Sequence, residues 1–221
     1  LLTSIIVAAL ALALAACAAP GADTGAEGVS VVTTVFAPYD FARQLVGDCG
    51  SVTMLLPPGG EAHSYEPTPK DILEIQNADV FIYVGGESDA WVTDVLESVG
   101  GDVYAVTLMD CVELLEEETV EGMEGGDAHE GHDHGHEAEY DEHVWTSPRN
   151  AKLICEKIAS ALSEADPGNA AEYEANLEGY SAELDKLDAA FTDIVARGSR
   201  DTLIFADRFP LLYFARAYGL K

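Results

Sequence analysis

The sequence predicts an α/β fold built around a mainly parallel β-sheet. Short β-rich runs alternate with helix-like segments through the first half of the chain, which is the pattern of successive βα units. A much longer helical segment follows in the second half and is long enough to join two lobes. The 221 residues, 48% of them apolar, suffice for one large domain or two small lobes with a core.

The alternating segments follow one another in a regular order between residues 29 and 108. Four apolar, β-rich runs predict strands at 29–35, 51–56, 79–85 and 102–108. Segments with helical character lie between them, at 38–47, 69–77 and around 91–99. We therefore expect an N-terminal α/β lobe over residues 29–160.

The most regular segment is a long amphipathic helix. Asp166 is the expected N-cap and Pro167 the first helical residue. The apolar residues recur at alternating spacings of four and three: Tyr173, Leu177, Tyr180, Leu184, Leu187, Phe191 and Ile194. About 30 residues at ~1.5 Å each give roughly 45 Å, ending near Arg197 and Gly198. Residues 161–198 are thus expected to link two lobes, with one partner of a coiled coil as the alternative.

The last residues predict the beginning of a second lobe over 199–221. Residues 202–206 (TLIFA) are expected to form a strand, and the segment after them has helical spacing. One strand and one helix cannot form a lobe alone, so most of the second lobe is expected to be missing from this sequence.

The N-terminal residues have the composition of an export signal. Residues 1–22 carry no charge, and Leu14-Ala15-Ala16-Cys17 resembles the lipobox of bacterial lipoproteins, whose cysteine is acylated. We expect residues 1–17 to be a lipoprotein signal peptide and 18–28 a tether, with an ordinary secretory signal as the alternative. Neither a basic segment nor an initiator Met precedes the apolar run, so we expect the sequence to start within its gene.

Charge and cysteine content narrow the classes of function. The formal net charge of −29 argues against binding to nucleic acid or to anionic membrane surfaces. It suits a protein that handles cations, although a solvated acidic surface would have the same composition. After export, Cys49, Cys111 and Cys155 permit one disulfide, whose pairing the sequence does not decide.

Four histidines lie in a segment that cannot form a core. Residues 116–142 are rich in His, Asp, Glu and Gly and contain hardly any aliphatic side chain, which predicts a mobile loop. Its clustered histidines are His129, His132, His134 and His136. We expect them to form an auxiliary loop that captures zinc weakly or senses its abundance; a solvated loop without function is the alternative.

Two other histidines occupy equivalent places in the chain. His63 precedes Thr68-Pro69 and His143 precedes Ser147-Pro148, so each lies in a short loop ahead of a helix start. Two imidazoles held by different loops are the beginning of a zinc site. Carboxylates stand near them to offset the positive helix ends: Glu61, Glu66, Asp141 and Glu142. The alternative is that each histidine only forms hydrogen bonds within its own loop.

The chain resembles the metal-binding lipoproteins of bacterial zinc/manganese ABC importers. The resemblance extends from about Val29 to the end and rests on HSYEPTPKD, GGESDAW, HVWTSP, the helix start at 166–177 and YFARAYGL. It implies two α/β lobes joined by a long rigid helix, with one metal ion in the cleft between them. The first two histidine ligands of the family fall on His63 and His143. The loop at 116–142 resembles that of the zinc-selective members, and imidazole-rich ligation also suits zinc.

The third family ligand is absent from its expected position. The family places a histidine after a strand in the pattern FHxxF, whereas this chain has FADRF, with Ala206 in place of the histidine. Asp207 is the candidate replacement; a water or a loop histidine is the alternative, or the site has changed. Asp207 can equally pair with Arg208 or cap the next helix. The resemblance places the fourth, acidic ligand beyond Lys221.

Together these features predict a monomeric extracytoplasmic receptor, lipid-anchored to the bacterial cell membrane, that delivers Zn²⁺ to an ABC permease. Mn²⁺ is the alternative metal. A surface adhesin or metal-buffering lipoprotein of the same fold is the alternative function. HExxH and a nucleophile elbow are both absent, so we do not expect an enzyme; a metallohydrolase would also need a general base and an open zinc position.

Overall fold

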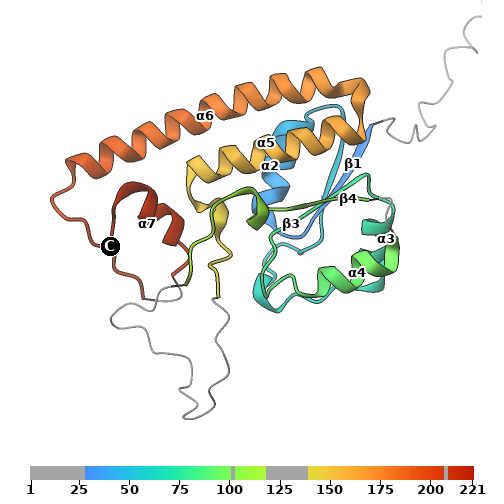
Figure 1. Cartoon of the computed structure of the whole chain (residues 1–221), viewed down its shortest axis with the longest axis horizontal. Helices are drawn as coiled ribbons and strands as arrows, with labels where there is room; N and C mark the ends of the chain where they lie inside the picture. Colours follow the sequence, from blue (N-terminus) through green and yellow to red (C-terminus); the bar gives the residue numbers. More distant parts are fainter. Residues whose placement is uncertain (1–27, 101–102, 118–138, 207–208) are drawn as a thin grey trace, which may run out of the picture.

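The computed structural model describes residues 28–100, 103–117, 139–206 and 209–221 (Figure 1). Its centre is a parallel sheet of four strands in the order β2-β1-β3-β4. The strands are β1 (Val29–Thr33), β2 (Gly50–Met54), β3 (Val80–Tyr83) and β4 (Tyr104–Thr107). The parallel α/β fold predicted from the alternating segments is confirmed.

Helices cover both faces of this sheet (Figure 1). One face carries α2 (Phe36–Val46) and α5 (Pro148–Ala165), and α6 (Ala170–Arg197) packs on both of these helices as an outer layer. The other face carries α3 (Pro69–Gln76) and α4 (Trp91–Val99). The short helix α7 (Leu212–Tyr218) lies near the C-terminal end of α6. Single helical turns lie at η1 (Ala62–Ser64), η2 (Met109–Cys111), η3 (Val144–Thr146) and η4 (Pro167–Asn169).

The two cores follow from the alternation of side chains along the strands. Val31 and Ile82 point into the larger core with α2 and α5, whereas Val32 and Phe81 point into the smaller core with α3 and α4. All four side chains are at most 5% exposed. Because both faces of the sheet are covered, the inner strand β3 (VFIY) is apolar throughout, whereas the edge strands β2 and β4 are partly exposed.

The two predicted helix starts are both present, and their caps differ. Thr68 caps α3 with a full capping box: Asp71 N–H donates to Thr68 Oγ1 (3.3 Å), and Thr68 N–H donates to Asp71 Oδ2 (2.8 Å). Ser147 precedes Pro148 at the start of α5, but its hydroxyl forms no capping hydrogen bond. Both histidine loops therefore lead into helices, as expected.

The long helix ends where predicted but begins later. Gly198 follows Arg197, and its N–H donates to the Val195 carbonyl (2.9 Å). At the other end, residues 161–165 belong to α5, and the turn η4 separates that helix from α6. Pro167 ends α5, because proline disfavours a helical conformation in the residue before it, and Asp166 is not helical (φ −133°, ψ 75°). Asp166 Oδ2 stabilises the turn by accepting bonds from Asn169 Nδ2 and Tyr173 Oη, both at 2.7 Å. The 28 residues of α6 at ~1.5 Å each span roughly 42 Å.

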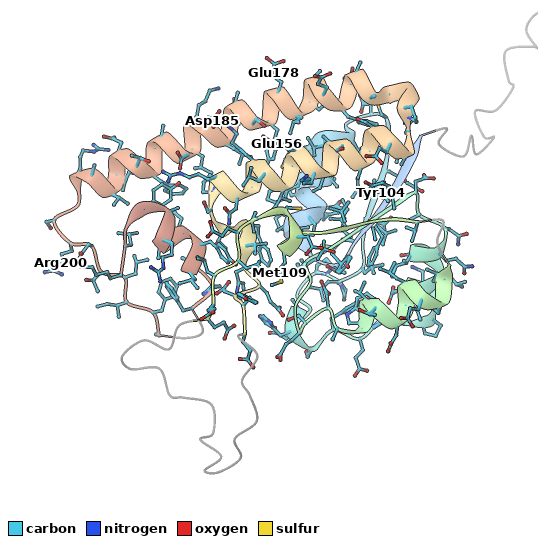
Figure 2. All side chains as sticks on the ribbon, in the orientation of Figure 1. Tyr104, Met109, Glu156, Glu178, Asp185 and Arg200 are labelled. Atoms are coloured by element: carbon cyan, nitrogen blue, oxygen red, sulfur yellow. The ribbon has the colours of Figure 1, made fainter. Side chains whose placement is uncertain are left out.

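The apolar stripe of α6 is buried only in part. Tyr173 and Leu184 are buried in the larger core, and Phe191 meets Phe214 of α7 edge-to-face at 5.0 Å. Leu187 and Ile194 are 43% and 58% exposed in the residues described. Figure 2 shows Glu178 on the outer side of the helix, away from α5.

The prediction of a strand at residues 202–206 is wrong. These residues form no strand or helix, and Ile204 is 93% exposed. A strand requires a neighbouring strand to pair its backbone. Within the described chain the segment pairs only around Lys221, which receives a bond from Leu203 N–H and donates one to the Asp201 carbonyl. The helix expected after it is present as α7. None of the helices in the described ranges is long and apolar enough to cross a membrane.

Candidate metal-binding site

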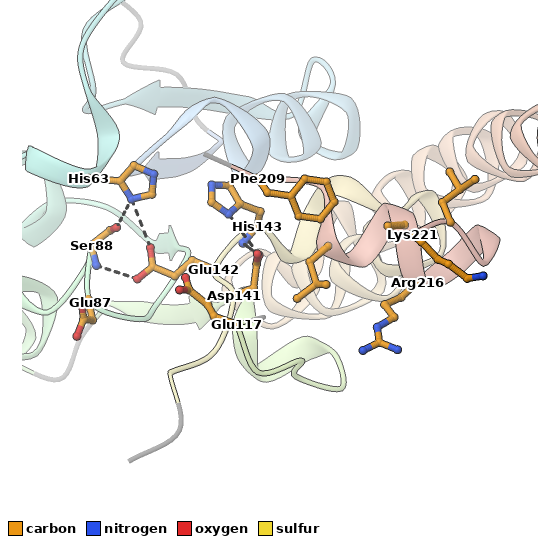
Figure 3. A pocket seen from close by; sticks show the side chains of 13 residues that line it. His63, Glu87, Ser88, Glu117, Asp141, Glu142, His143, Phe209, Arg216 and Lys221 are labelled. Atoms are coloured by element: carbon orange, nitrogen blue, oxygen red, sulfur yellow. Dashed lines mark hydrogen bonds and ion pairs between the residues drawn. The ribbon is translucent and has the colours of Figure 1, made fainter. Parts of the chain in front are cut away.

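The site lies at the carboxyl edge of the sheet. Strand order reverses between β1 and β3, and ligands of open α/β sheets bind in the crevice beyond the strand ends at such a point. Val35 follows β1 and Val84 follows β3; both line a 270 Å³ cavity together with His63 and His143. A larger cleft of 740 Å³ also includes both histidines and is closed on its other side by residues of α7 and the chain after it (Figure 3).

The structure brings the two predicted histidines together. The ring centroids of His63 and His143 are 5.6 Å apart, and the rings are inclined at 58°. Their side chains are 37% and 22% exposed, so a solvated cation can reach them. Eighty residues separate them in sequence, and η1 and η3 place them on facing loops.

His63 is held by its Nδ1 atom. This nitrogen lies 2.9 Å from Ser88 Oγ and 4.0 Å from Glu142 Oε2. Its backbone N–H donates to Glu61 Oε1 (3.3 Å), which fixes the turn around it. The ring nitrogen without a dashed line in Figure 3 is Nε2, and it faces His143.

His143 is held in the same way by an aspartate. Asp141 Oδ1 accepts the backbone N–H of His143 at 2.7 Å and lies 3.3 Å from its Nδ1. Asp141 is only 5% exposed, and the Trp145 ring lies 5.6 Å from the His143 ring. The Nε2 atom of His143 faces His63 (Figure 3).

With the proton on Nδ1, each imidazole directs its Nε2 lone pair into the same space. A carboxylate can only accept a hydrogen bond, so Asp141 favours the tautomer of His143 that has the proton on Nδ1 and the lone pair on Nε2. The Ser88 hydroxyl can likewise accept a hydrogen bond from Nδ1 of His63, which would leave the lone pair on Nε2. Zinc-binding histidines commonly have such partners on the other ring nitrogen, which fix the tautomer and the ring orientation. The alternative that each histidine bonds only within its own loop is contradicted for His63, because Ser88 belongs to another loop.

Ser88 and Gly86 join the two histidine loops, and sequence analysis did not identify them. Glu142 Oε1 accepts the Ser88 N–H at 2.9 Å. Glu142 can come this close because residue 86 has no side chain: a Cβ atom there would lie 2.6 Å from Glu142 Cγ and closer still to the carboxylate oxygen. The GGESDAW motif was visible in the sequence, but its contact with residue 142 depends on the fold.

Carboxylates dominate one side of the larger cleft. Glu87, Glu117, Asp141 and Glu142 line it, opposite Arg216 and Lys221. Burial raises the pKa of Glu117, and Asp141, Glu139 and Glu142 raise it further, while His143 lowers it. Glu117 was not predicted as a site residue. Of the carboxylates expected to offset the helix ends, Glu61, Asp141 and Glu142 contact the histidine loops, whereas Glu66 lines neither cavity.

The described residues supply two nitrogen donors to the site. Among them, His, Cys, Asp and Glu side chains form no group of three arranged to hold a metal ion. Several predicted site residues lie outside the described residues. They are Asp207, the lipidation candidate Cys17 and the loop histidines His129, His132, His134 and His136. Cys49, Cys111 and Cys155 are free thiols, and burial raises the pKa of Cys155 to about 12.

Comparison with known proteins supplies the family. The family model "ZnuA: Zinc-uptake complex component A periplasmic" matches residues 31–221. The high-affinity zinc uptake system protein ZnuA of Bacillus subtilis is 35% identical over 221 residues, covering 98% of this chain and 68% of that protein. The zinc-binding protein AdcA of Streptococcus pyogenes serotype M6 is 33% identical over 203 residues, covering 89% of this chain.

The fold agrees with these matches. The crystal structure of Zn(II)-bound AdcA from Streptococcus pneumoniae aligns with a TM-score of 0.74 at 29% identity, over 88% of this chain and 38% of that one. The chain spans 39% of the length of the Streptococcus pyogenes relative. The family model covers residues 31–221, which include the whole sheet except the first two residues of β1. The chain therefore belongs to the family of the periplasmic zinc-uptake complex component A.

Proposed function

We propose that this chain is an extracytoplasmic receptor that binds Zn²⁺ between His63 and His143 and passes it to an ABC permease. The observation that carries the proposal is the pair of facing Nε2 atoms, on rings whose centroids are 5.6 Å apart and whose Nδ1 atoms are both held. Partial exposure of both rings suits a receptor, because its metal has to enter and leave.

Zinc is the proposed cargo for chemical reasons. Imidazole nitrogen is a common zinc ligand, whereas manganese prefers sites rich in carboxylate and water. Two relatives named for zinc uptake or zinc binding support this choice. The nearby carboxylates contact the Nδ1 side of the rings and thus lie behind the two Nε2 donors. Asp207 remains our proposed third ligand.

We also propose that Cys17 anchors the receptor to the membrane through an acyl group. The support is the LAAC sequence after an uncharged apolar run, followed by a small-residue tether at 18–28. Mass spectrometry of the chain extracted from bacterial membranes should find lipid on Cys17 as the first residue.

A zinc titration against a competing chelator tests the site. His63→Ala and His143→Ala should each weaken Zn²⁺ binding by orders of magnitude, because each removes one nitrogen donor. His134→Ala is the control, since it removes one histidine of the auxiliary loop and should leave the tight site intact. If His63→Ala and His143→Ala both bind zinc like the parent chain, the proposal is wrong.

A further inference from the structure

The hydroxyl of Tyr213 lies between the two chain segments that flank residues 118–138. It accepts the Leu115 N–H at 3.1 Å and donates to the Asp141 carbonyl at 3.0 Å. Tyr213 is 4% exposed, so water does not compete for these bonds. A single buried phenol thus links α7 to both flanking segments.

The flanking segments also bind each other. Asp141 N–H donates to the Leu115 carbonyl (3.0 Å), and Glu117 N–H donates to the Glu139 carbonyl (2.9 Å). Glu116 and Tyr140 form an antiparallel bridge between them. The position of Asp141 is therefore set by this short pairing together with Tyr213.

Asp141 connects this pairing to His143, the proposed metal ligand. Its side chain accepts the backbone N–H of His143 and lies within 3.3 Å of Nδ1. A shift of the Asp141 backbone would move this carboxylate and with it the direction of the His143 Nε2 atom. Tyr213 and Asp141, the two residues that connect α7 to the His143 imidazole, are both at most 5% exposed.

Helix α7 is itself fixed to the rest of the fold. Arg149 at the start of α5 donates to the Ala217 carbonyl (3.1 Å) and to Asp188 of α6 (2.8 Å). Tyr218 donates to the same Asp188 at 2.9 Å, and the Arg149 guanidinium lies 5.3 Å from the centroid of its ring. Tyr213 therefore projects from a helix that α5 and α6 hold in place.

We propose that Tyr213 is a positioning residue for the metal site: its hydroxyl fixes Asp141, and Asp141 orients His143. The proposal rests on the proposed function, because it assumes that His143 binds the metal. It adds a residue of the C-terminal segment, 70 positions after His143, to the set that determines zinc affinity.

Two tyrosines of α7 give a matched test in the full chain. Tyr213→Phe removes the bridging hydroxyl and keeps the ring, whereas Tyr218→Phe removes a hydroxyl that donates to Asp188 of α6. We expect Tyr213→Phe to weaken Zn²⁺ binding by about tenfold, the lower end of the range for residues that support a metal ligand. It should also change the visible absorption bands of the protein loaded with Co²⁺, which report the geometry around the metal. Tyr218→Phe should match the parent in both measurements.

Melting temperatures of both variants separate positioning from general destabilisation. A weaker zinc affinity and altered Co²⁺ bands in Tyr213→Phe alone would support the proposal. Parent-like binding and bands in Tyr213→Phe, or equal losses in both variants, would overturn it. His143→Ala, measured alongside, separates a failure of the Tyr213 proposal from a failure of the proposed zinc site. If His143→Ala also binds zinc like the parent, the proposed function itself is wrong.

Discussion

At the scale of single residues, Gly86 decides how closely Glu142 approaches the loop that follows β3. Its φ of +75° is in the left-handed region that favours glycine, and a Cβ there would meet the Glu142 side chain. The Glu142 carboxylate binds the Ser88 N–H, and the Ser88 hydroxyl holds His63. The orientation of the His63 imidazole, our proposed zinc ligand, thus depends on the absence of a side chain at residue 86.

Gly86→Ala should therefore weaken zinc binding by about tenfold, because it displaces Glu142 and Ser88 behind His63. Gly100→Ala is the control: its φ of +84° also strains a residue with a side chain, but nothing lies within 4 Å of its Cβ position. Backbone strain should lower the unfolding free energy of each variant by about 1–3 kcal/mol, and Gly86→Ala should lose more because its Cβ also meets Glu142. Chelator competition and thermal melts measure the two effects. Equal zinc affinities for the two variants would show that the Gly86 contact does not matter to the site.

The histidines could be predicted from sequence, but most of their partners could not. His63 and His143 were recognisable because each lies just ahead of a proline-started helix, which is a local signal. Ser88 and Glu117 carry no such signal. Ser88 reaches the site because it follows the carboxyl end of β3, and Glu117 reaches it because its segment pairs with residues 139–141. Both arrangements depend on contacts between segments that are distant in sequence.

At the scale of elements, the break between α5 and α6 determines where the long helix starts. Asp166 accepts hydrogen bonds from Asn169 and Tyr173, and Tyr173 is fully buried against the larger core. The sequence indicated an N-cap at Asp166, but the end of α5 at Ala165 was missed. Two helices separated by a single turn give one nearly continuous helical pattern, and the signal for the boundary between them is Pro167 rather than the periodicity.

Asp166→Asn should destabilise the fold at neutral pH by about 1–2 kcal/mol, since a charged acceptor is replaced by a neutral one. Hydrogen bonds from Asn169 and Tyr173 lower the pKa of Asp166 below its ordinary value of 3.8. Its stabilising contribution is thus complete above the ordinary value and is lost as the pH falls through the folded pKa. The difference in melting temperature between parent and variant should shrink below about pH 4. A difference that stays constant down to pH 2 would contradict this account.

The segment at 118–138 can be tested as an auxiliary element because its flanks are paired without it. We propose that replacing residues 118–138 with a short Gly-Ser turn leaves the Leu115, Asp141 and Tyr213 bonds in place. Calorimetry should then show the loss of weak additional zinc equivalents with the tight site retained, because the sequence of this segment has too few apolar residues to hold its histidines in one geometry before zinc binds. Loss of the tight site would indicate instead that a loop histidine is the third ligand.

Residues 202–206 show the limit of element prediction from composition. TLIFA has the residues of a strand, but no strand of the described sheet lies beside it. Strand formation depends on a partner, whereas the helix α7 satisfies its backbone internally and was predicted correctly. The same reasoning explains why the four sheet strands were predictable: each has a neighbour along the sheet.

At the scale of the whole molecule, the fold forms the candidate site at one edge of the sheet, and the net charge of the chain favours cations there. The strand order opens a crevice between β1 and β3, the histidines stand above it, and four carboxylates line the adjoining cleft. A net charge of −29 makes the surrounding potential attractive to a divalent cation over distances set by ionic strength. Helix α7 closes the far side of this cleft and, through Tyr213, contacts the segments that carry Asp141.

The central claim is that one zinc ion binds between His63 and His143 through their Nε2 atoms. A crystal structure of the full chain loaded with Zn²⁺, with an anomalous difference map recorded at the zinc edge, tests it most directly. We expect a single strong peak in the cleft within ~2.0–2.1 Å of both Nε2 atoms, with Ser88 and Asp141 still on the Nδ1 atoms. The same map will show whether the Asp207 carboxylate lies within bonding distance. A zinc ion held without either histidine, or through Nδ1, would contradict the account.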